Sequence, residues 1–449
     1  MPHYMANRSI LSRDSIKVKR CRLSAQAISM NWQTNRKKEI PKKLIALGLY
    51  LLVLYHFVMV WYDYPEGLCF EKIVAGSFLF FAGVLFGLGA LIEIRKQGLS
   101  PFSPVTRVLF FFLMSWGLVV IIRSLSMDAS DLRSLFAHPT ALWVWIMPVV
   151  MLVGAQRSYW KILNRAFILS VGMAIILSII ILLFDQEKAV EFVASPWGGV
   201  FMPSSFLLLT WFNQSKAGKY VVLFGIFAHF VGSVLLAARV SIAILFCYIT
   251  CFIGLCLLDR NKRSKKIAGA FFVISFVVIL AGCTLWLLRP YSEFIDDRID
   301  NFNRGLYVDT RSNIVNEFIE SMEGQEMIIG RGALGRYWSP FFVHRYTDTE
   351  GADSPDRLVI ESGFLCILLK GGCIMLLFFI AITVPAAILG IFYSRNLLVR
   401  ACGLYILITL ITMIPSLHLR LNLPFVLFWL SVGACLCKKT RYALDEEIF

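Results

Sequence analysis

The run "LIALGLYLLVLYHFVMVWY", residues 44–62, decides the class of fold. It contains no Lys, Arg, Asp or Glu, and a helix of this length extends about 28 Å. That length approaches the roughly 30 Å thickness of the hydrocarbon core of a bilayer. A helix satisfies all its backbone hydrogen bonds internally, as lipid requires. The run therefore predicts a transmembrane helix.

Similar runs recur along the chain. The sequence is 58% hydrophobic and 14% aromatic, a composition that a water-soluble core of this length could not bury. We therefore predict an all-α polytopic membrane protein with about twelve transmembrane helices. After the first, the predicted spans are residues 73–92, 105–122, 140–154, 166–184, 198–212, 220–237, 240–258, 267–288, 372–393, 401–415 and 423–437.

Lys and Arg are concentrated in alternate short loops, whereas the intervening loops carry Asp and Glu. The positive-inside rule then places both termini in the cytoplasm. These basic loops account for the net charge of +15, so no nucleic-acid partner is expected. The predicted organisation is a basic cytoplasmic tail (1–43), nine transmembrane helices (44–288), a large periplasmic loop of amphipathic helices (289–371), three transmembrane helices (372–437) and a cytoplasmic tail (438–449).

Within the predicted loop, "DTRSNIVNEFIESMEGQEMIIG" indicates an amphipathic helix. It should begin at Asp309 or Thr310 and end at Gly324. Arg311 in its first turn opposes the helix dipole. Either an anionic ligand, which the free N–H groups would also favour, or an ion pair with Glu317 would offset that cost. The apolar stripe of this helix consists of Ile314, Val315, Phe318, Ile319 and Met322.

A G-x-G-x-x-G pattern follows at Gly330, Gly332 and Gly335. A dinucleotide site needs a buried strand before this pattern and a helix after it. Here an amphipathic helix precedes it, and a segment rich in proline and turn residues follows. We therefore predict a tight turn that brings the backbone close to a neighbouring helix or ligand.

Two further charged residues stand out. Arg239 lies between two apolar runs in "LLAARVSIAILF", where it either snorkels to the interface or belongs to a site. Glu361 precedes a short apolar helix that should break at the Lys-Gly-Gly sequence of residues 370–372. Its carboxylate could act as a general base at the membrane surface, or it could pair with Arg357.

The order of these features resembles the superfamily of O-antigen polymerases and O-antigen ligases. Those features are the arginine in "AARVSIAIL", the arginine that opens "TRSNIVNEFIESM", the "IIGRG" turn and the segment "ESGFLCILLKGGCIMLL". Ligases of that family carry a histidine where this chain has "IESGFL" with Glu361, which favours a polymerase. The resemblance implies a bacterial inner-membrane glycosyltransferase that uses an undecaprenyl-diphosphate-linked glycan, with membrane lipids, a flippase and a chain-length regulator as partners.

The resemblance also implies residue roles. Arg239 and Arg311 would bind the diphosphate, since arginine binds phosphate bidentately and stays protonated. We expect no cofactor and no metal, because the predicted loop contains no D-x-D sequence. The candidate catalytic residues are Glu361, Arg311 and Arg239, and the candidate substrate-binding residues are Arg239, Arg311, Arg331, Arg336, His344 and Arg357.

Two alternatives remain open. A ligase would transfer the lipid-linked glycan to a different acceptor by the same chemistry. A lipid-linked oligosaccharide flippase or a twelve-span carrier belongs to another class. Transporters usually have two similar halves, and the sequence has no evident internal repeat, which disfavours this class.

Overall fold

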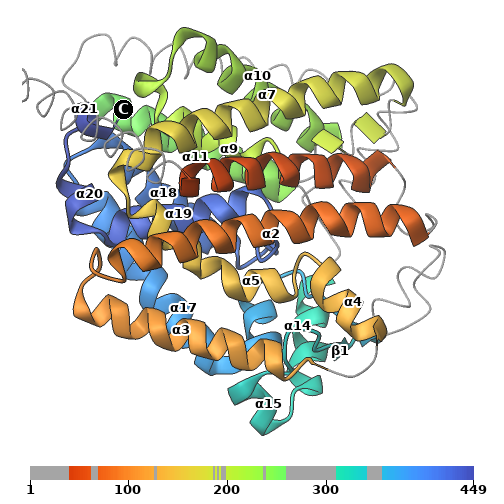
Figure 1. The fold of residues 1–449 in the computed structure, drawn as a ribbon. Helices are drawn as coiled ribbons and strands as arrows, with labels where there is room; N and C mark the ends of the chain where they lie inside the picture. The colour runs from red at the N-terminus through yellow and green to blue at the C-terminus, as the bar shows by residue number, and fades with distance from the viewer. Residues whose placement is uncertain are drawn as a thin grey trace, which may run out of the picture.

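The computed structural model describes residues 40–61, 69–125, 129–185, 188–189, 192–193, 199–235, 239–258, 310–340 and 356–448. Within these ranges the regular elements are helices, apart from one two-stranded sheet. Figure 1 shows the long helices lying side by side, with α14, α15 and β1 gathered in the lower part of the view. The expected all-α architecture is therefore confirmed for this part of the chain.

The elements follow one another along the chain. The first are helix Ile40–Trp61, α2 (Cys69–Gln97), α3 (Pro104–Ile122), α4 (Ala129–Ala137), α5 (Leu142–Ile146), η1 (Met147–Val150), α6 (Met151–Gly154), η2 (Arg157–Tyr159) and α7 (Trp160–Phe184). Next come α9 (Met202–Leu209), η3 (Trp211–Asn213), α10 (Lys216–Leu235), α11 (Arg239–Leu258), α14 (Thr310–Ser321), α15 (Gly324–Ile329), β1 (Tyr337–Trp338) and β2 (Asp356–Arg357). The last are α17 (Gly363–Phe392), α18 (Leu397–Thr412), α19 (Leu423–Leu436), α20 (Lys438–Tyr442) and α21 (Asp445–Ile448).

Six of the described helices are long and apolar enough to cross a membrane. A seventh span results if the bent pair Asp131–Ala137 and Leu142–Gly154, which meets at 54°, is counted as one. The predicted count of about twelve is not confirmed. The predicted span 198–212 contains α9, whose 8 residues extend only about 12 Å, and the predicted span 267–288 lies outside the described residues.

The outward faces of the long helices are apolar. On α3, Val105 is 69% exposed and Phe111 is 64% exposed, although neither side chain is polar. Leu183 and Phe184 at the end of α7 are exposed to a similar extent. Such surfaces would be costly in water and suit contact with lipid chains, in agreement with a multi-pass membrane protein.

Helix α19 lies at the centre of the bundle. Every residue from Leu423 to Leu436 is buried, and none is charged. Asn422 caps its first turn by accepting a hydrogen bond from the Phe425 backbone N–H at 3.0 Å. A helix that is apolar on all sides belongs in an interior, so the other helices surround it.

Loops that the charge pattern assigns to one side of the membrane lie together at one end of the helices. Asn396 Nδ2 donates to the Thr440 carbonyl at 2.8 Å, and Arg157 pairs with Glu447. Lys42 lies over the ring of Tyr159. The start of the first helix and the segments after α6, after α17 and after α19 are therefore neighbours, as the alternation of charged loops predicts.

Helix α17 is broken at the predicted Lys-Gly-Gly sequence. Gly372 has φ 67° and ψ −173°, whereas the residues on both sides are helical. The left-handed φ favours glycine because it has no Cβ. Such a break leaves backbone carbonyls without their helical partners. Trp116 on α3 binds one of them, because its Nε1–H donates to the Gly371 carbonyl at 2.8 Å.

Backbone N–H groups in the turn of residues 330–335 donate to two further carbonyls at the break. The Arg331 N–H donates to the Leu369 carbonyl at 2.8 Å, and the Gly332 N–H donates to the Lys370 carbonyl at 2.9 Å. Gly330, with φ 71°, lies so close that an added Cβ would be 2.3 Å from the Lys370 oxygen. This confirms the prediction of a glycine turn that passes close to a neighbouring helix.

Two details of this segment differ from or extend the sequence prediction. Helix α14 ends at Ser321, and Gly324 begins α15 instead of ending α14. The reason is a capping box, in which Glu323 and Glu326 satisfy backbone N–H groups at the start of α15. The glycine pattern is preceded by α15 and followed by β1, so it lacks the strand–turn–helix order of a dinucleotide site.

A buried amide pair fixes α7 against the segment after η3. Asn164 and Gln214 each donate to the other's side-chain oxygen at 2.9 Å. We expect Asn164→Leu to destabilise the protein by about 1–3 kcal/mol, because it leaves the Gln214 amide without this partner. Thermal unfolding in detergent measures the effect. The double variant Asn164→Leu/Gln214→Leu should recover part of the loss, and an unchanged single variant would contradict the prediction.

Candidate functional site

A groove of ≈ 300 Å³ lies between α14, the start of α17 and the segment that follows α18. It is the described cavity that contains a candidate catalytic residue from the sequence, Glu361. Ile314, Val315, Ile360, Glu361, Ser362, Phe364, Leu365, Ile414 and Pro415 line it. Apart from Glu361 and Ser362, the lining is apolar, so the groove suits an extended apolar chain next to a polar group.

The amphipathic pattern of α14 forms one wall of the groove. Ile314, Phe318 and Met322, spaced four residues apart, are all at least nine-tenths buried. The Phe318 ring meets the Tyr337 ring edge-on, with centroids 6.1 Å apart. Val315 is half-buried and faces the groove, whereas Ile319 is 53% exposed. The predicted stripe is thus divided between the core, the groove and the surface.

The opposite wall is the start of α17, which the loop after α18 holds in place. The Gly363 N–H donates to the carbonyls of Met413 and Ser416, at 2.8 and 3.1 Å. The Ser362 hydroxyl also donates to the Met413 carbonyl at 3.3 Å. These bonds satisfy the N–H and O–H donors at the N-terminus of α17. They also fix the position of Glu361, which lies just before that N-terminus.

Glu361 lies at the rim of the groove next to Arg357. The Arg357 Nη2 is 3.8 Å from the Glu361 Oε1, and the Glu361 side chain is 51% exposed. The Arg357 Nη1 also donates to the Tyr337 hydroxyl at 3.2 Å, across the antiparallel pair of β1 and β2. Of the two interpretations from the sequence, the ion pair is therefore present, and it leaves the carboxylate accessible from the groove.

Apart from Glu361, none of the predicted site residues is among the described residues that line the groove. Arg311 is the second residue of α14 and Arg239 the first residue of α11, but their side chains lie outside the described part, as does the whole of His344. Arg336 is exposed. Glu317 accepts a hydrogen bond from Ser339 at 2.6 Å.

Arg331 binds its own segment. Its guanidinium donates to the carbonyls of Ser321 and Arg336 and to Glu326 Oε2, the last at 2.7 Å. These bonds join the end of α14, α15 and the glycine turn. Because its Nη1 and Nη2 groups donate to these acceptors, the geometry indicates a structural role for Arg331, and a role in substrate binding stays a prediction.

This arrangement predicts a pH-dependent stability. The hydrogen bond from Arg331 lowers the pKa of the Glu326 carboxyl below its ordinary value of 4.5. A lowered pKa in the folded state stabilises the fold above pH 4.5, and that stabilisation is lost as the pH falls through the folded-state pKa. Glu326→Gln should therefore lower the unfolding temperature more at pH 7 than at pH 3.

The expected effect of Glu326→Gln is at most about 1 kcal/mol, because the pair is partly exposed. Glu320→Gln, at an exposed position of α14, is the matched control. Thermal unfolding at both pH values measures the difference, and an equal effect of Glu326→Gln at pH 3 and pH 7 would contradict this assignment.

Two buried cations, Lys370 and Arg420, were not predicted as site residues. Lys370 is fully buried, and its Nζ donates to the Gly335 carbonyl at 2.7 Å. Arg420, in the loop after α18, is also buried. Lys370, Arg420 and Arg336 all lie close enough to act electrostatically on the His138 ring. Lys370 inside an apolar run was a usable signal, but the sequence could not reveal that these residues meet.

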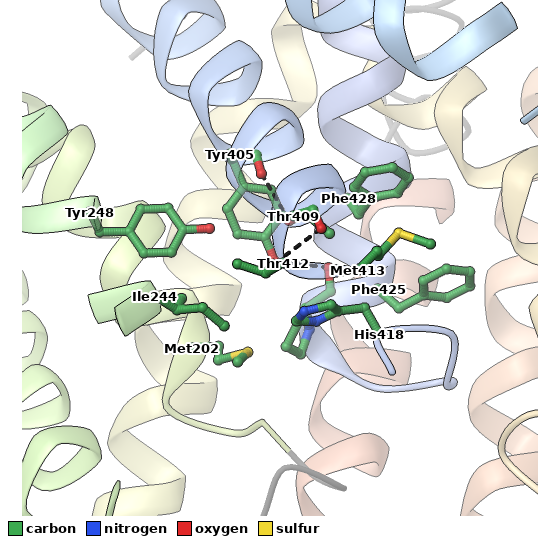
Figure 2. Close-up of a pocket in the computed structure, with 11 residues that line it drawn as sticks. Met202, Ile244, Tyr248, Tyr405, Thr409, Thr412, Met413, His418, Phe425 and Phe428 are labelled. Carbon is green, nitrogen blue, oxygen red and sulfur yellow. Dashed lines mark hydrogen bonds between the residues drawn. The ribbon is translucent and has the colours of Figure 1, made fainter. Parts of the chain in front are cut away.

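A second cavity lies deeper, between α9, α11, α18 and α19. Figure 2 shows Tyr248 and Tyr405 facing each other on one side of it and His418 on another, and the two tyrosine rings are 6.0 Å apart. Its free space of ≈ 20 Å³ would hold about one water molecule. None of the residues predicted as site residues lines it, so it is not the candidate site.

Among the described residues, no three His, Cys, Asp or Glu side chains are grouped so that they could hold a metal ion.

Neither a protein-family model nor a curated protein sequence matches this chain. The candidate site therefore rests on the geometry of the groove and on the residues around it.

Proposed function

We propose that this protein is a membrane glycosyltransferase. It would polymerise undecaprenyl-diphosphate-linked oligosaccharide repeat units into a surface polysaccharide, at the periplasmic face of a bacterial inner membrane. The observation that carries this proposal is the apolar groove with an accessible carboxylate, Glu361, at its rim. An apolar groove suits a lipid chain, and a carboxylate beside it can accept a proton from a hydroxyl.

The reaction requires few chemical groups. An acceptor hydroxyl loses its proton to Glu361, its oxygen bonds to the anomeric carbon of the donor, and the bond from that carbon to the lipid diphosphate breaks. The leaving diphosphate is already an anion, so cations at the site stabilise the charge that develops on it. Arg311 in the first turn of α14 and Arg239 at the start of α11 are the proposed cations, and no metal is needed for this scheme.

In this proposal, helix α14 contributes both to the groove for the lipid chain and to the binding of the diphosphate. Val315 contributes to the groove, while Arg311 lies one turn earlier on the same helix. Residues four apart lie on the same side of a helix. A lipid chain in the groove would therefore have its head group near the N-terminus of α14, where the backbone N–H groups also favour an anion.

A ligase would use the same groups with a different acceptor, and it remains the nearest alternative. A flippase is favoured by one specific observation, the break of α17 at Gly372, since broken helices are common in transporters. In this chain, however, the turn of residues 330–335 binds the carbonyls at the break. The break is thus filled by protein, which favours the enzyme.

Glycan laddering in cells tests the proposal. Cells that lack the gene are complemented with wild type, Arg311→Ala or Arg239→Ala, at matched membrane levels. Arg95→Ala, an exposed arginine at the far end of α2, is the control. We expect both test variants to lose long chains and to keep a single displayed repeat unit, whereas the control should give normal ladders.

The other outcomes are equally informative. Normal ladders in both test variants would contradict the assignment of these arginines. Loss of the single displayed unit as well would contradict a polymerase and favour a ligase or a flippase.

A further inference from the structure

A cavity of ≈ 430 Å³ lies at the end of the helices away from the groove. The start of α17 forms a wall of the groove, whereas this cavity lies near the end of α17. Asn396, just after α17, donates to the carbonyl of Thr440, which lines the cavity. Figure 1 shows the neighbouring helices α20 and α21 at the left of the view, away from α14. The volume is within the range of ligand pockets, about 300–1,000 Å³.

Three segments of the chain, residues 97–101, 155–157 and 437–447, contribute the residues that line this cavity. Hydrogen bonds hold the third segment against its neighbours. The Thr440 hydroxyl donates to the Ala155 carbonyl at 2.6 Å, and Asp445 Oδ1 accepts from the Leu397 N–H at 3.0 Å. Ile448 in α21 is only 3% exposed. The walls are therefore packed structure, and the cavity exists before any ligand binds.

Cationic side chains outnumber acids around this cavity. Arg157 and Lys439 line it from two segments, and Glu447 is the single acid among its described lining residues. Glu447 pairs with Arg157, and both side chains are about half exposed. Lys439 is exposed. A third cation, Arg107, lies beside the wall, since its Nη2 donates to the Ser100 carbonyl at 3.3 Å. This excess of positive charge favours an anionic ligand.

The surroundings of the cavity favour an anion that belongs to a lipid. The alternation of charged loops assigns this end of the helices to the cytoplasmic side, where basic pockets between membrane helices bind the head groups of anionic lipids. Tyr442, which lines the cavity, is 42% exposed, and Leu444, next to the lining residue Ala443, is 57% exposed. Exposed apolar side chains beside a polar cavity suit an amphipathic ligand.

We propose that this cavity binds the phosphate of an anionic membrane lipid, with Arg157 and Lys439 as the cations that contact it. A guanidinium binds two oxygens of one phosphate, which an ammonium supplements as a point charge. Glu447 competes with the phosphate, because both anions bind the same guanidinium. The site lies at the other end of α17 from the groove and does not depend on the proposed glycosyltransferase activity.

Lipid binding to purified full-length protein in a neutral detergent tests this proposal. Native mass spectrometry measures the affinity for phosphatidylglycerol. We expect Arg157→Gln and Lys439→Gln each to weaken binding about fivefold or more, because each removes a charge-assisted contact. Glu447→Gln should instead tighten binding about twofold or more, because it removes the competing anion. Arg165→Gln, at an exposed position of α7 that does not line the cavity, is the matched control and should bind like wild type.

The opposite signs for the two partners of one ion pair distinguish a binding site from a structural contact. If the pair only held η2 to α21, Arg157→Gln and Glu447→Gln would change binding in the same direction, and that result would overturn the proposal. Equal affinities of wild type, Arg157→Gln and Lys439→Gln would also overturn it.

Two other ligands identify the part of the lipid that is bound. Phosphatidylcholine has the same phosphate but no net charge, and it should bind about fivefold more weakly than phosphatidylglycerol. Glycerol phosphate offers the same phosphate chemistry without acyl chains and should also bind more weakly. Phosphatidylcholine binding equal to that of phosphatidylglycerol would overturn the assignment of an anionic lipid, and glycerol phosphate binding as tight as the lipid would overturn the lipid as the source of the phosphate.

Discussion

Glu361→Gln should reduce glycan elongation by about 10²–10⁴-fold, because an amide cannot accept the proton of the acceptor hydroxyl. The side chain keeps its size and its place at the rim of the groove. Its ion pair with Arg357 is partly exposed, so losing the pair should cost at most about 1 kcal/mol of stability. Elongation is measured from glycan ladders at matched protein levels.

Two control variants distinguish the loss of a general base from the loss of a negative charge or of an ion pair. Glu320→Gln removes one carboxylate from an exposed position of α14 and should leave elongation unchanged. Arg357→Gln removes the partner of Glu361 but not the base, so its effect should be much smaller than that of Glu361→Gln. Equal and small effects of Glu361→Gln and Arg357→Gln would contradict the assignment of Glu361 as the base and leave the ion pair as its role.

Gly330→Ala should destabilise the protein by about 3 kcal/mol or more. The residue has φ 71°, which is costly for any residue with a Cβ. The added Cβ would also lie 2.3 Å from the Lys370 carbonyl oxygen, so the turn would have to move away from the break in α17. The unfolding temperature in detergent measures this effect.

Gly172→Ala is the control for Gly330→Ala. Gly172 lies in α7, and an added Cβ there would meet nothing within 4 Å. Alanine is favoured over glycine inside a helix, so this variant should be as stable as wild type or slightly more stable. An unchanged unfolding temperature for Gly330→Ala would contradict the description of the turn as a close packing element.

The sequence predicted the features that depend on local pattern. The glycine turn and the break at the Lys-Gly-Gly sequence follow from spacing and residue type, and the structure contains both. The stripe of α14 is buried only in part, because Ile319 is 53% exposed. The end of α14 was placed at Gly324, because glycine commonly ends helices. The competing capping box of Glu323 and Glu326 begins a new helix there.

The number of membrane spans was harder to predict. Hydrophobicity alone cannot separate a spanning helix from a short buried one. Helix α9 has 8 residues and α19 has 14, and both are wholly or almost wholly buried in the bundle. Around residues 140–154 the apolar run is divided into α5, η1 and α6, with Pro148 in the 3₁₀ turn. A helix buried inside the bundle and a helix that faces lipid can therefore have the same apolar amino-acid composition.

The candidate site was only partly predictable for a different reason. Glu361 and Arg357 are close in sequence, and their pairing could be anticipated. Arg420 and His138 are far apart in the chain, and no sequence pattern predicts that the Leu421 N–H beside Arg420 donates to the carbonyl of Pro139, next to His138. Arg331 was predicted to bind substrate, but its guanidinium binds the carbonyls and carboxylate of its own segment.

The most direct measurement of the central claim uses purified protein in liposomes with an undecaprenyl-diphosphate-linked repeat unit as the only glycan. The proposed function predicts that wild type converts this donor into lipid-linked chains of two or more repeat units and releases undecaprenyl diphosphate, whereas Glu361→Gln does not. Movement of the donor between leaflets with no new glycosidic bond would contradict a glycosyltransferase and would instead support a flippase.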